Sequence, residues 1–366
     1  MHSETLSPPA DTSTPERRSR LGMLWKNARK SYILRSIAQG LFTLWAVTTF
    51  TFVLIRFLPG NPVDIKIQQL INSQNLTYEE AARQAAGLFP FDPSEPVVTQ
   101  YMRFMGNLLR GDLGKSITSP STTVVSQIAE FLPWTLFSVG LGLLISFTLG
   151  TLIGVAIAYW RGGLFDNIVT FFSSILYGIP DFVIALLIIL IGGVQLGLFK
   201  PGSLQGGSDP GIPPGFTPEY ISSLLRHVFL PLVTYLTTTI GGWILTMKSS
   251  TITTLGEDYI TVAKARGLSQ RRILLGYVGR NALLPQVTRL AISVGFILGG
   301  SVIIETIFNY PGLGRTLSNA IIARDYTTMQ GVFLAIAMAV ILSNMLADLL
   351  YGMLDPRVRV GGGSSR

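Results

Sequence analysis

A glycine-containing segment, GKS at positions 114–116, is the part of this sequence that comes closest to a nucleotide-binding motif. In a phosphate-binding loop, backbone amides and a lysine hold the phosphates, and the motif requires another glycine five residues before its second one. That position is Leu109 here, so the motif is incomplete. We therefore interpret the polar residues as loop-ordering and the glycines as turn-forming; these residues are Asp112, Lys115, Gly111 and Gly114.

The sequence also lacks the residues that other catalytic or metal-binding sites would need. The chain has no cysteine, and its histidines are His2 and His227. A two-histidine metal site within a structured region therefore cannot be assembled, and a Ser-His-Asp triad has a single candidate base. We expect no catalytic residue, no metal site and no cofactor, and we interpret His227 as a packing residue at a membrane boundary.

The segment 258–285 has the most distinctive charge pattern in the chain, because it is basic and helix-forming and lies between two apolar stretches. Gly267 can adopt the left-handed conformation that ends one helix, and Ser269 can cap the next. Basic residues around this turn give a positive field that suits docking on a soluble partner; they are Lys264, Arg266, Arg271 and Arg272. The alternative is an ordinary cytoplasmic loop, in which such residues follow the positive-inside rule.

The apolar stretches on either side of this segment predict an integral membrane protein. The mean hydropathy is +0.46, 48% of the residues are hydrophobic and 13% are charged. A membrane-spanning helix needs about 20 apolar residues. Four charge-free windows approach or exceed that length, at residues 134–158, 182–199, 228–247 and 329–346, and two weaker candidates lie at 37–58 and 290–304. We expect an all-α integral membrane protein with six transmembrane helices.

The distribution of basic residues predicts the orientation of these spans. Several lysines and arginines between positions 17 and 35 precede the first span and should hold the N-terminus in the cytoplasm. Six crossings return the C-terminus and the basic segment to the same side, together with most of the 28 Lys and Arg residues. This juxtamembrane placement beside anionic lipid explains the net charge of +8 without nucleic acid.

The segments outside the spans differ in composition. Residues 1–36 form a cytoplasmic tail whose beginning, rich in Ser, Thr and Pro, is expected to be disordered. Residues 37–354 form the transmembrane domain, and residues 355–366 form a cytoplasmic tail with a flexible GGGSS sequence. The largest outer loop, at about 59–131, has helical signals at 78–86 and 96–109, and a second outer loop at about 200–226 is a connector rich in Gly and Pro. The basic cytoplasmic loop occupies about 248–285.

Six short motifs follow one another along the chain: FLPGNP at 57–62, GNLLRGDLGKS at 106–116, YPGLGR at 310–315, RDY at 324–326, DLLY at 348–351 and LDPR at 354–357. In this order and at these distances they resemble the B-type permease subunit of the ABC importers for oligopeptides, dipeptides and nickel. The resemblance extends from about Ile37 to Val360. It implies the type I ABC importer permease fold and a transport subunit, not an enzyme.

The same resemblance identifies segment 258–285 with the coupling loop that inserts a short helix into a groove on the ATPase subunit. Ala263 and Gly267 match the alanine and glycine of that loop, and Leu284 and Pro285 match its end. The family's Glu-Ala pair is replaced by Thr261 and Val262, and the interval from glycine to proline is longer than in sugar and amino-acid importers. The residues expected to couple to the ATPase are Ala263, Lys264, Arg266, Gly267, Ser269, Arg271, Arg272 and Pro285. Each arginine equally fits a solvated positive charge.

The resemblance also implies a complex in the cytoplasmic membrane of a prokaryote. Its other parts would be a second, C-type permease subunit, two cytoplasmic ATP-binding subunits and an extracytoplasmic substrate-binding protein. Together they would translocate peptides or similar small solutes by alternating access. The alternative is an ion-coupled secondary transporter, but such proteins place ionisable residues or broken helices at mid-membrane in internal repeats, and the sequence has neither repeat nor ion-coupling cluster.

Asp181 is a candidate of a different kind, because it follows Pro180 inside the apolar stretch 168–199. An unpaired carboxylate at mid-bilayer costs at least about 2.5 kcal/mol on insertion scales. The span could begin near Ile179 and leave Asp181 at the cytoplasmic interface, which is the interpretation that we favour. If it is buried instead, Asp181 becomes a candidate gate or pathway residue.

Overall fold

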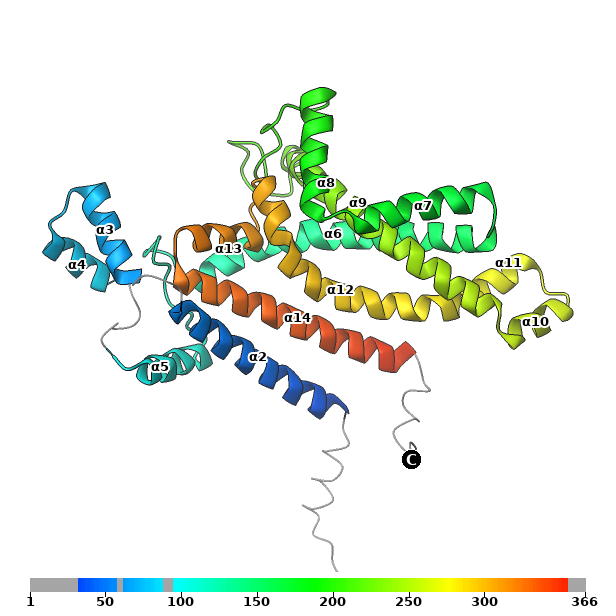
Figure 1. Ribbon diagram of the computed structural model, residues 1–366, viewed down its shortest axis with the longest axis horizontal. Coiled ribbons are helices and arrows are strands. Elements are labelled where there is room, and N and C mark those ends of the chain that lie inside the picture. Colours follow the sequence, from blue (N-terminus) through cyan, green and yellow to red (C-terminus); the bar gives the residue numbers. More distant parts are fainter. Residues whose placement is uncertain (1–31, 58–61, 88–94, 355–366) are drawn as a thin grey trace, which may run out of the picture. The chain divides into compact units, whose positions relative to one another are not determined.

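The computed structural model describes residues 32–57, 62–87 and 95–354, and this part of the chain is helical (Figure 1). One isolated antiparallel β-bridge joins Lys115 to Thr123. The expected disorder at residues 1–16 and the C-terminal tail at 355–366 lie outside the described residues. The chain divides into two compact units, Met1–Thr43 and Leu44–Arg366. The first unit contributes the beginning of helix α2 (Tyr32–Arg56), and the second contains the elements below.

Four helices in the described part of the chain are long and apolar enough to cross a membrane. They are α2, α6 (Val124–Tyr159), α9 (Pro218–Leu255) and α14 (Tyr326–Leu354). A fifth candidate is a pair bent by 104°, formed by α7 (Leu164–Gly178) and by α8 (Asp181–Leu187) with the π-helical segment η1 (Ile188–Gln195). The weaker predicted span at 290–304 lies within α12 (Arg280–Ile307). The all-α membrane prediction is confirmed, whereas the count of six spans is not.

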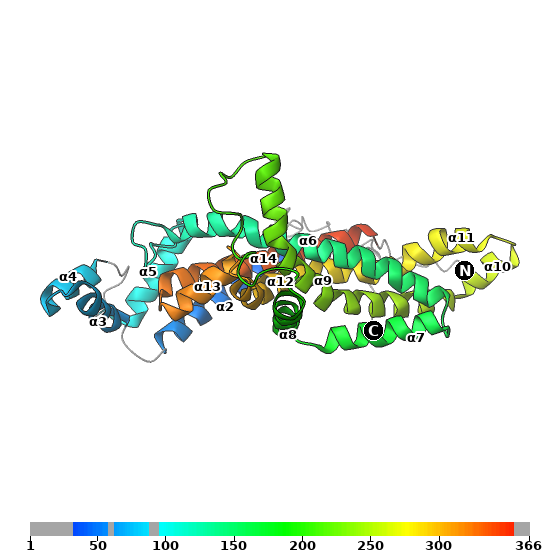
Figure 2. The same cartoon turned by 90° about the horizontal axis from the view of Figure 1, so that it is seen from above.

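Helices α6 and α9 form the most extensive helix pair, and α12 packs on both of them (Figures 1 and 2). Glycines on α6 make this contact close. A Cβ atom added at Gly150 would lie 2.5 Å from the Cβ of Trp243, and one added at Gly154 would lie 2.6 Å from the Cβ of Met247. Small residues spaced four apart let membrane helices approach closely, so that dispersion contacts replace the missing hydrophobic effect.

The first predicted outer loop contains more helix than its sequence indicated. The signal at 78–86 corresponds to α4 (Tyr78–Ala86), and the signal at 96–109 corresponds to α5 (Val97–Leu109). An unpredicted helix, α3 (Pro62–Gln74), packs on α4 through Ile67, Leu70, Ala81 and Ala85.

Both predicted outer loops are also shorter than expected. The first ends at Thr123, whose side chain accepts a hydrogen bond from the Ser126 amide at the start of α6. The second ends at Thr217, which caps α9 in the same way by accepting from the Tyr220 amide. In each case a threonine N-cap starts the helix before the apolar stretch begins.

Helix α13 (Leu313–Ile322) is held by a buried carboxylate and was not predicted. The Oε2 of Glu305 accepts hydrogen bonds from the amides of Gly314 at 2.7 Å and Arg315 at 3.1 Å. Its Oε1 accepts from the Thr135 hydroxyl at 2.7 Å. A Cβ atom at Gly312 would lie 2.2 Å from the Glu305 carboxyl carbon, so this contact requires glycine. Glu305 thereby satisfies free amides at a helix start and joins α12 to α6.

Candidate functional site

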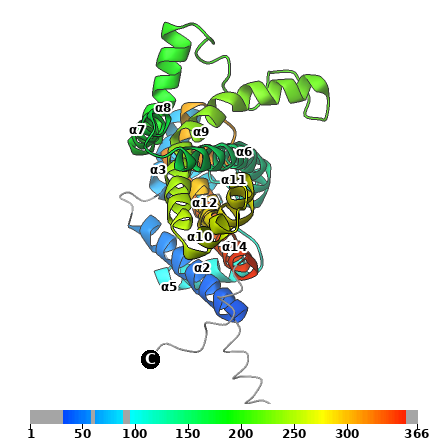
Figure 3. The same cartoon turned by 90° about the vertical axis from the view of Figure 1, so that its right-hand side faces the viewer.

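Residues 256–279, which we call the α9–α12 loop, lie at one end of α9 and α12 (Figures 1 and 3). The loop contains α10 (Asp258–Ala265), α11 (Gln270–Arg272) and the π-helical segment η2 (Ile273–Gly279). The predicted order of helix, turn and helix is confirmed. The loop is shorter than the range 248–285 because α9 continues to Leu255 and α12 begins at Arg280.

Gly267 ends α10 in the manner predicted from the sequence. Its φ is +72°, and its amide donates a 2.9 Å hydrogen bond to the carbonyl of Lys264. The next amide, of Leu268, donates at 3.3 Å to the carbonyl of Ala263. Apart from Gly267 and its two chain neighbours, no heavy atom of the described residues lies within 4 Å of a Cβ added at this position. Glycine is therefore favoured here by backbone conformation and not by lack of space.

Ser269 does not cap α11 with its side chain, so that prediction is wrong. The residue occupies the N-cap position with an extended backbone, but its hydroxyl makes no capping hydrogen bond. Its carbonyl instead accepts from the amide of Ile273 at 3.0 Å. Ser269 is exposed, and water can satisfy the first amides of a helix at such a position.

The α9–α12 loop has its own apolar interior. Ile260 and Val278 are 0% exposed, and Ala263 and Ile273 pack with them against Met247 of α9. This packing makes the loop a continuation of the helical bundle and not a flexible connector. Ala263, predicted to contact a partner, therefore faces the interior of the loop.

The remaining predicted residues separate into two groups. Pro285 lies inside α12 and not in the loop. The side chains or backbone of the others form the exposed surface of the turn; these residues are Lys264, Arg266, Gly267, Ser269, Arg271 and Arg272. The structure thus brings four cationic side chains and two turn residues together on one exposed bend.

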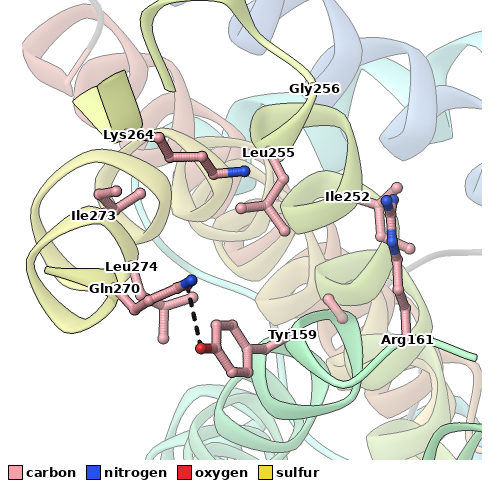
Figure 4. A pocket seen from close by; sticks show the side chains of 10 residues that line it. Tyr159, Arg161, Ile252, Leu255, Gly256, Lys264, Gln270, Ile273 and Leu274 are labelled. Atoms are coloured by element: carbon pink, nitrogen blue, oxygen red, sulfur yellow. Dashed lines mark hydrogen bonds between the residues drawn. The ribbon is translucent and has the colours of Figure 1, made fainter. Parts of the chain in front are cut away.

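A recess of about 250 Å³ lies between this loop and the adjacent ends of α6 and α9 (Figure 4). Lys264 of α10 and Arg161, which follows α6, both line it. The Tyr159 hydroxyl at the end of α6 donates a 3.2 Å hydrogen bond to the Oε1 of Gln270. The loop is therefore joined to α6 as well as to the two helices that it connects.

An ion pair joins α7 to α9 near the beginning of the loop. The Nζ of Lys248 lies 2.5 Å from the Oδ1 of Asp166, and these side chains are 19% and 6% exposed. Lys248 also donates to the Thr170 hydroxyl at 2.9 Å, and the Gly162 amide donates to Asp166 at 3.0 Å. Each charge therefore has both an ionic partner and further hydrogen bonds.

Asp181 begins α8 directly after the 104° bend. Its side chain is exposed on this subunit and lies near the Thr238 hydroxyl on α9. Thr238 is at the middle of the charge-free stretch 228–247. The helix thus begins near Ile179, as the sequence analysis favoured, and Asp181 lies beside the middle of this stretch because α7 runs along α9 before the chain bends.

Arg289 is a polar residue that the sequence analysis did not select. Its Nη1 donates a 3.1 Å hydrogen bond to the carbonyl of Gly242 and a short one to the hydroxyl of Thr246. Its guanidinium carbon lies 5.0 Å from the ring centroid of Trp243 and 6.0 Å from that of Tyr177. The apolar window begins only at residue 290, so Arg289 resembled a helix end, whereas α12 continues back to Arg280.

His227 has no catalytic arrangement, although a serine and an aspartate lie near it. The Ser223 hydroxyl donates to Asp209 at 2.8 Å and not to the histidine. The Nδ1 of His227 lies 2.8 Å from the carbonyl of Ser223, and its Nε2 lies 3.9 Å from Asp209. Since the serine is not paired with the base, this cluster fastens the segment before α9 and does not activate a nucleophile.

The region before α6 also folds as the sequence predicted. Gly111 and Gly114 have φ values of +76° and +79°, and the Gly114 amide donates to the Oδ1 of Asp112 at 2.8 Å. These residues form turns and order the loop, as expected. Among the described residues, no group of three or more His, Asp and Glu side chains is arranged to hold a metal ion.

Comparison with known proteins gives consistent matches. Residues 150–360 match the family described as "Binding-protein-dependent transport system inner membrane component". The chain is 34% identical to the di/tripeptide transport system permease protein DppB of Pseudomonas aeruginosa, over 90% of this chain and 98% of that protein. It is 30% identical to the oligopeptide transport system permease protein AppB of Bacillus subtilis, over 90% of this chain and 99% of that protein. It is 31% identical to the dipeptide transport system permease protein DppB of Escherichia coli K12, over 90% of this chain and 98% of that protein.

Proposed function

The chain belongs to the family of binding-protein-dependent transport system inner membrane components, and we propose that it moves short peptides inward under the control of its α9–α12 loop. It is a multi-pass membrane subunit of an ABC importer, and ATP hydrolysis takes place in separate subunits.

The construction of the α9–α12 loop supports its role in coupling. Its buried side chains, such as Ile260 and Val278, connect it rigidly to α9 and α12. Its exposed turn at Gly267 presents arginines to the surrounding solution. A partner that displaces a rigid loop displaces the helices attached to it, since packed bundles switch between discrete arrangements. The exposed cationic turn on a packed loop is the observation that carries this part of the proposal.

We place the α9–α12 loop and both termini in the cytoplasm. The basic residues flanking the apolar helices favour this side, and a coupling surface must face the subunits that bind ATP. In the same proposal, the complex contains a second, C-type permease subunit, two ATP-binding subunits and an extracytoplasmic substrate-binding protein.

Short peptides are the proposed solute because the relatives are named as permeases for peptides. The Pseudomonas aeruginosa protein is a di/tripeptide permease, and the Escherichia coli protein is a dipeptide permease. Asp181 is the proposed pathway residue within this chain. Its depth beside Thr238 and its exposure on the isolated subunit support a position facing a partner subunit or water, because lipid contact would be unfavourable there.

Reconstitution of the purified subunit in vesicles tests this function. We expect uptake of radiolabelled alanyl-alanine only when the second permease subunit, the ATPase subunits and ATP are present together with the binding protein. Vesicles without ATPase subunits, but with a proton or sodium gradient, are the control. Peptide flux driven by the ion gradient alone would contradict the proposal and would favour the ion-coupled alternative.

A further inference from the structure

We propose that Asp181 and Arg289 form a two-point site for the charged ends of a short peptide on the translocation pathway. The Asp181 carboxylate would receive the peptide's α-ammonium group, and the Arg289 guanidinium would receive its terminal carboxylate. This inference rests on the proposed function, because it assumes that peptides pass along this face of the subunit.

The guanidinium of Arg289 is held in place but keeps donors available. Both hydrogen bonds that it makes within the described part of the chain, to Gly242 and Thr246, come from Nη1. The ring of Trp243, which is 2% exposed, lies beside it at 5.0 Å. A guanidinium has five N–H donors, so Nη2 and Nε remain able to bind an anion. An arginine fixed in this way loses little conformational freedom when it binds a carboxylate.

Asp181 and Arg289 differ from the other charged pair on these helices. Asp166 and Lys248 lie 2.5 Å apart and neutralise one another. Within residues 32–57, 62–87 and 95–354, no salt bridge joins Asp181 to a base or Arg289 to a carboxylate. A permanent charge at membrane depth is unfavourable unless protein, water or solute compensates it. A zwitterionic solute would compensate both of these charges at once.

The two charges lie along one face of α9. Asp181 is beside Thr238, and Arg289 contacts Gly242 and Thr246. These α9 residues are four apart and therefore share a face. At about 1.5 Å per residue, the two contact points are separated by about 6 to 12 Å along the helix axis. An extended peptide spans about 3.3 to 3.6 Å per residue, so two or three residues match this separation.

An exposed aromatic ring, that of Tyr177, lies beside Arg289. Tyr177 is 59% exposed and lies beside Gly242, where an added Cβ would approach the tyrosine ring within 2.9 Å and the Arg289 Nη2 within 2.8 Å. Glycine at this position keeps the guanidinium and the ring close to the helix backbone. An aromatic ring next to a cation offers a surface on which a peptide side chain can rest while its termini are held by charge.

Binding of three related probes distinguishes the two ends of the site. The assembled complex of permease and ATPase subunits, prepared without the substrate-binding protein, would be titrated with alanyl-alanine, its C-terminal amide and its N-acetyl derivative. Saturation-transfer NMR detects such weak binding. For the wild-type complex we expect each blocked peptide to bind at least about tenfold more weakly than the free dipeptide, because each loses one charge-assisted contact.

Variants of the two residues should separate the preference for a free carboxylate from the preference for a free ammonium group. R289Q should bind the amide and the free carboxylate about equally while still discriminating against the N-acetyl peptide, and R289K should retain part of the carboxylate preference. D181N should bind the N-acetyl peptide and the free dipeptide about equally, while still discriminating against the amide. The exposed residues Arg103 and Asp64 provide matched controls, since R103Q and D64N change the same side chains outside the proposed site and should keep both preferences.

Two results would overturn the inference. One is that R289Q and D181N keep both wild-type preferences. The other is that each variant weakens all three peptides equally, which would indicate a structural role. If the complex transports peptides with ATP but shows either result, the two-point site alone is wrong. If the intact wild-type complex neither binds nor transports a peptide, the proposed function itself is wrong.

Discussion

The hydroxyl of Thr118 donates a 3.0 Å hydrogen bond to the Oδ2 of Asp325, a residue 207 positions later in the chain. Ser116 donates a short hydrogen bond to the same oxygen, and the amide of Thr328 donates to the Oδ1 at 3.1 Å. The serine that resembled part of a phosphate-binding motif therefore fastens the loop before α6 to the start of α14.

This contact should depend on pH in a defined direction. Burial raises the pKa of Asp325, but hydrogen bonds from Ser116 and from backbone amides outweigh it, so the pKa lies below the ordinary value of 3.8. A carboxyl with a lowered folded pKa stabilises the protein fully above its unfolded pKa, and this contribution is lost as the pH falls through the folded value. We expect D325N to lower the free energy of unfolding by about 1 to 3 kcal/mol at pH 7.

Thermal unfolding of the assembled complex at pH 7 and about pH 3 would measure this effect. The difference between wild type and D325N should shrink at the lower pH, because the Asp325 carboxyl binds a proton more readily in the unfolded chain than in the folded protein, where its pKa is lowered. D64N, at an exposed position on α3, is the matched control and should unfold like wild type. An equal difference between wild type and D325N at both pH values would contradict the prediction.

Gly267→Val should separate ATP hydrolysis from transport. The left-handed conformation at this position, with φ of +72°, costs an ordinary L-residue about 1 to 2 kcal/mol and a β-branched one more. The variant should insert in the membrane, because the spans are untouched, but it should present the turn wrongly to the ATPase. ATP hydrolysis and peptide uptake, measured together in vesicles, should lose their coupling.

Gly256→Ala is a suitable control for that experiment. Gly256 has φ of −83°, and the nearest atom to an added Cβ is 3.4 Å away, so alanine fits without strain. It should retain coupled transport. Wild-type association of the Gly267→Val variant with the ATPase subunits would count against the role of this turn.

Removing one member of the Asp166–Lys248 pair should destabilise the subunit strongly. These side chains are 6% and 19% exposed, and an unpaired buried charge typically costs about 3 to 5 kcal/mol. Lys248→Met and Asp166→Asn should each lower the unfolding temperature, and the double variant should recover part of the loss. The Glu95–Arg103 pair, with side chains 28% and 44% exposed, is the reference and should contribute about 1 kcal/mol or less. A double variant no more stable than either single one would show that the charges do not act as a pair.

Local sequence patterns predicted those helices whose beginning and end are determined by residues within the same segment. Helix α4 matches its predicted range, and the end of α10 occurs at Gly267 because the backbone conformation favours glycine there. The buried Glu305 and the helix α13 that it holds were not predicted. Their stability comes from contacts between α12, α13 and α6, and no spacing within one segment indicates such contacts.

The sequence by itself determined that this chain is an α-helical membrane protein with a basic loop between two apolar helices, and it indicated the family. These properties follow from hydropathy, charge and short motifs, which act over a few residues. Only the tertiary structure decided that Ala263 is buried in the loop, that Asp181 lies deep along α9 and that Arg289 contacts Gly242. The reason is that depth and partners depend on where a helix bends and on which helix packs against it, and residues far apart in the chain set both.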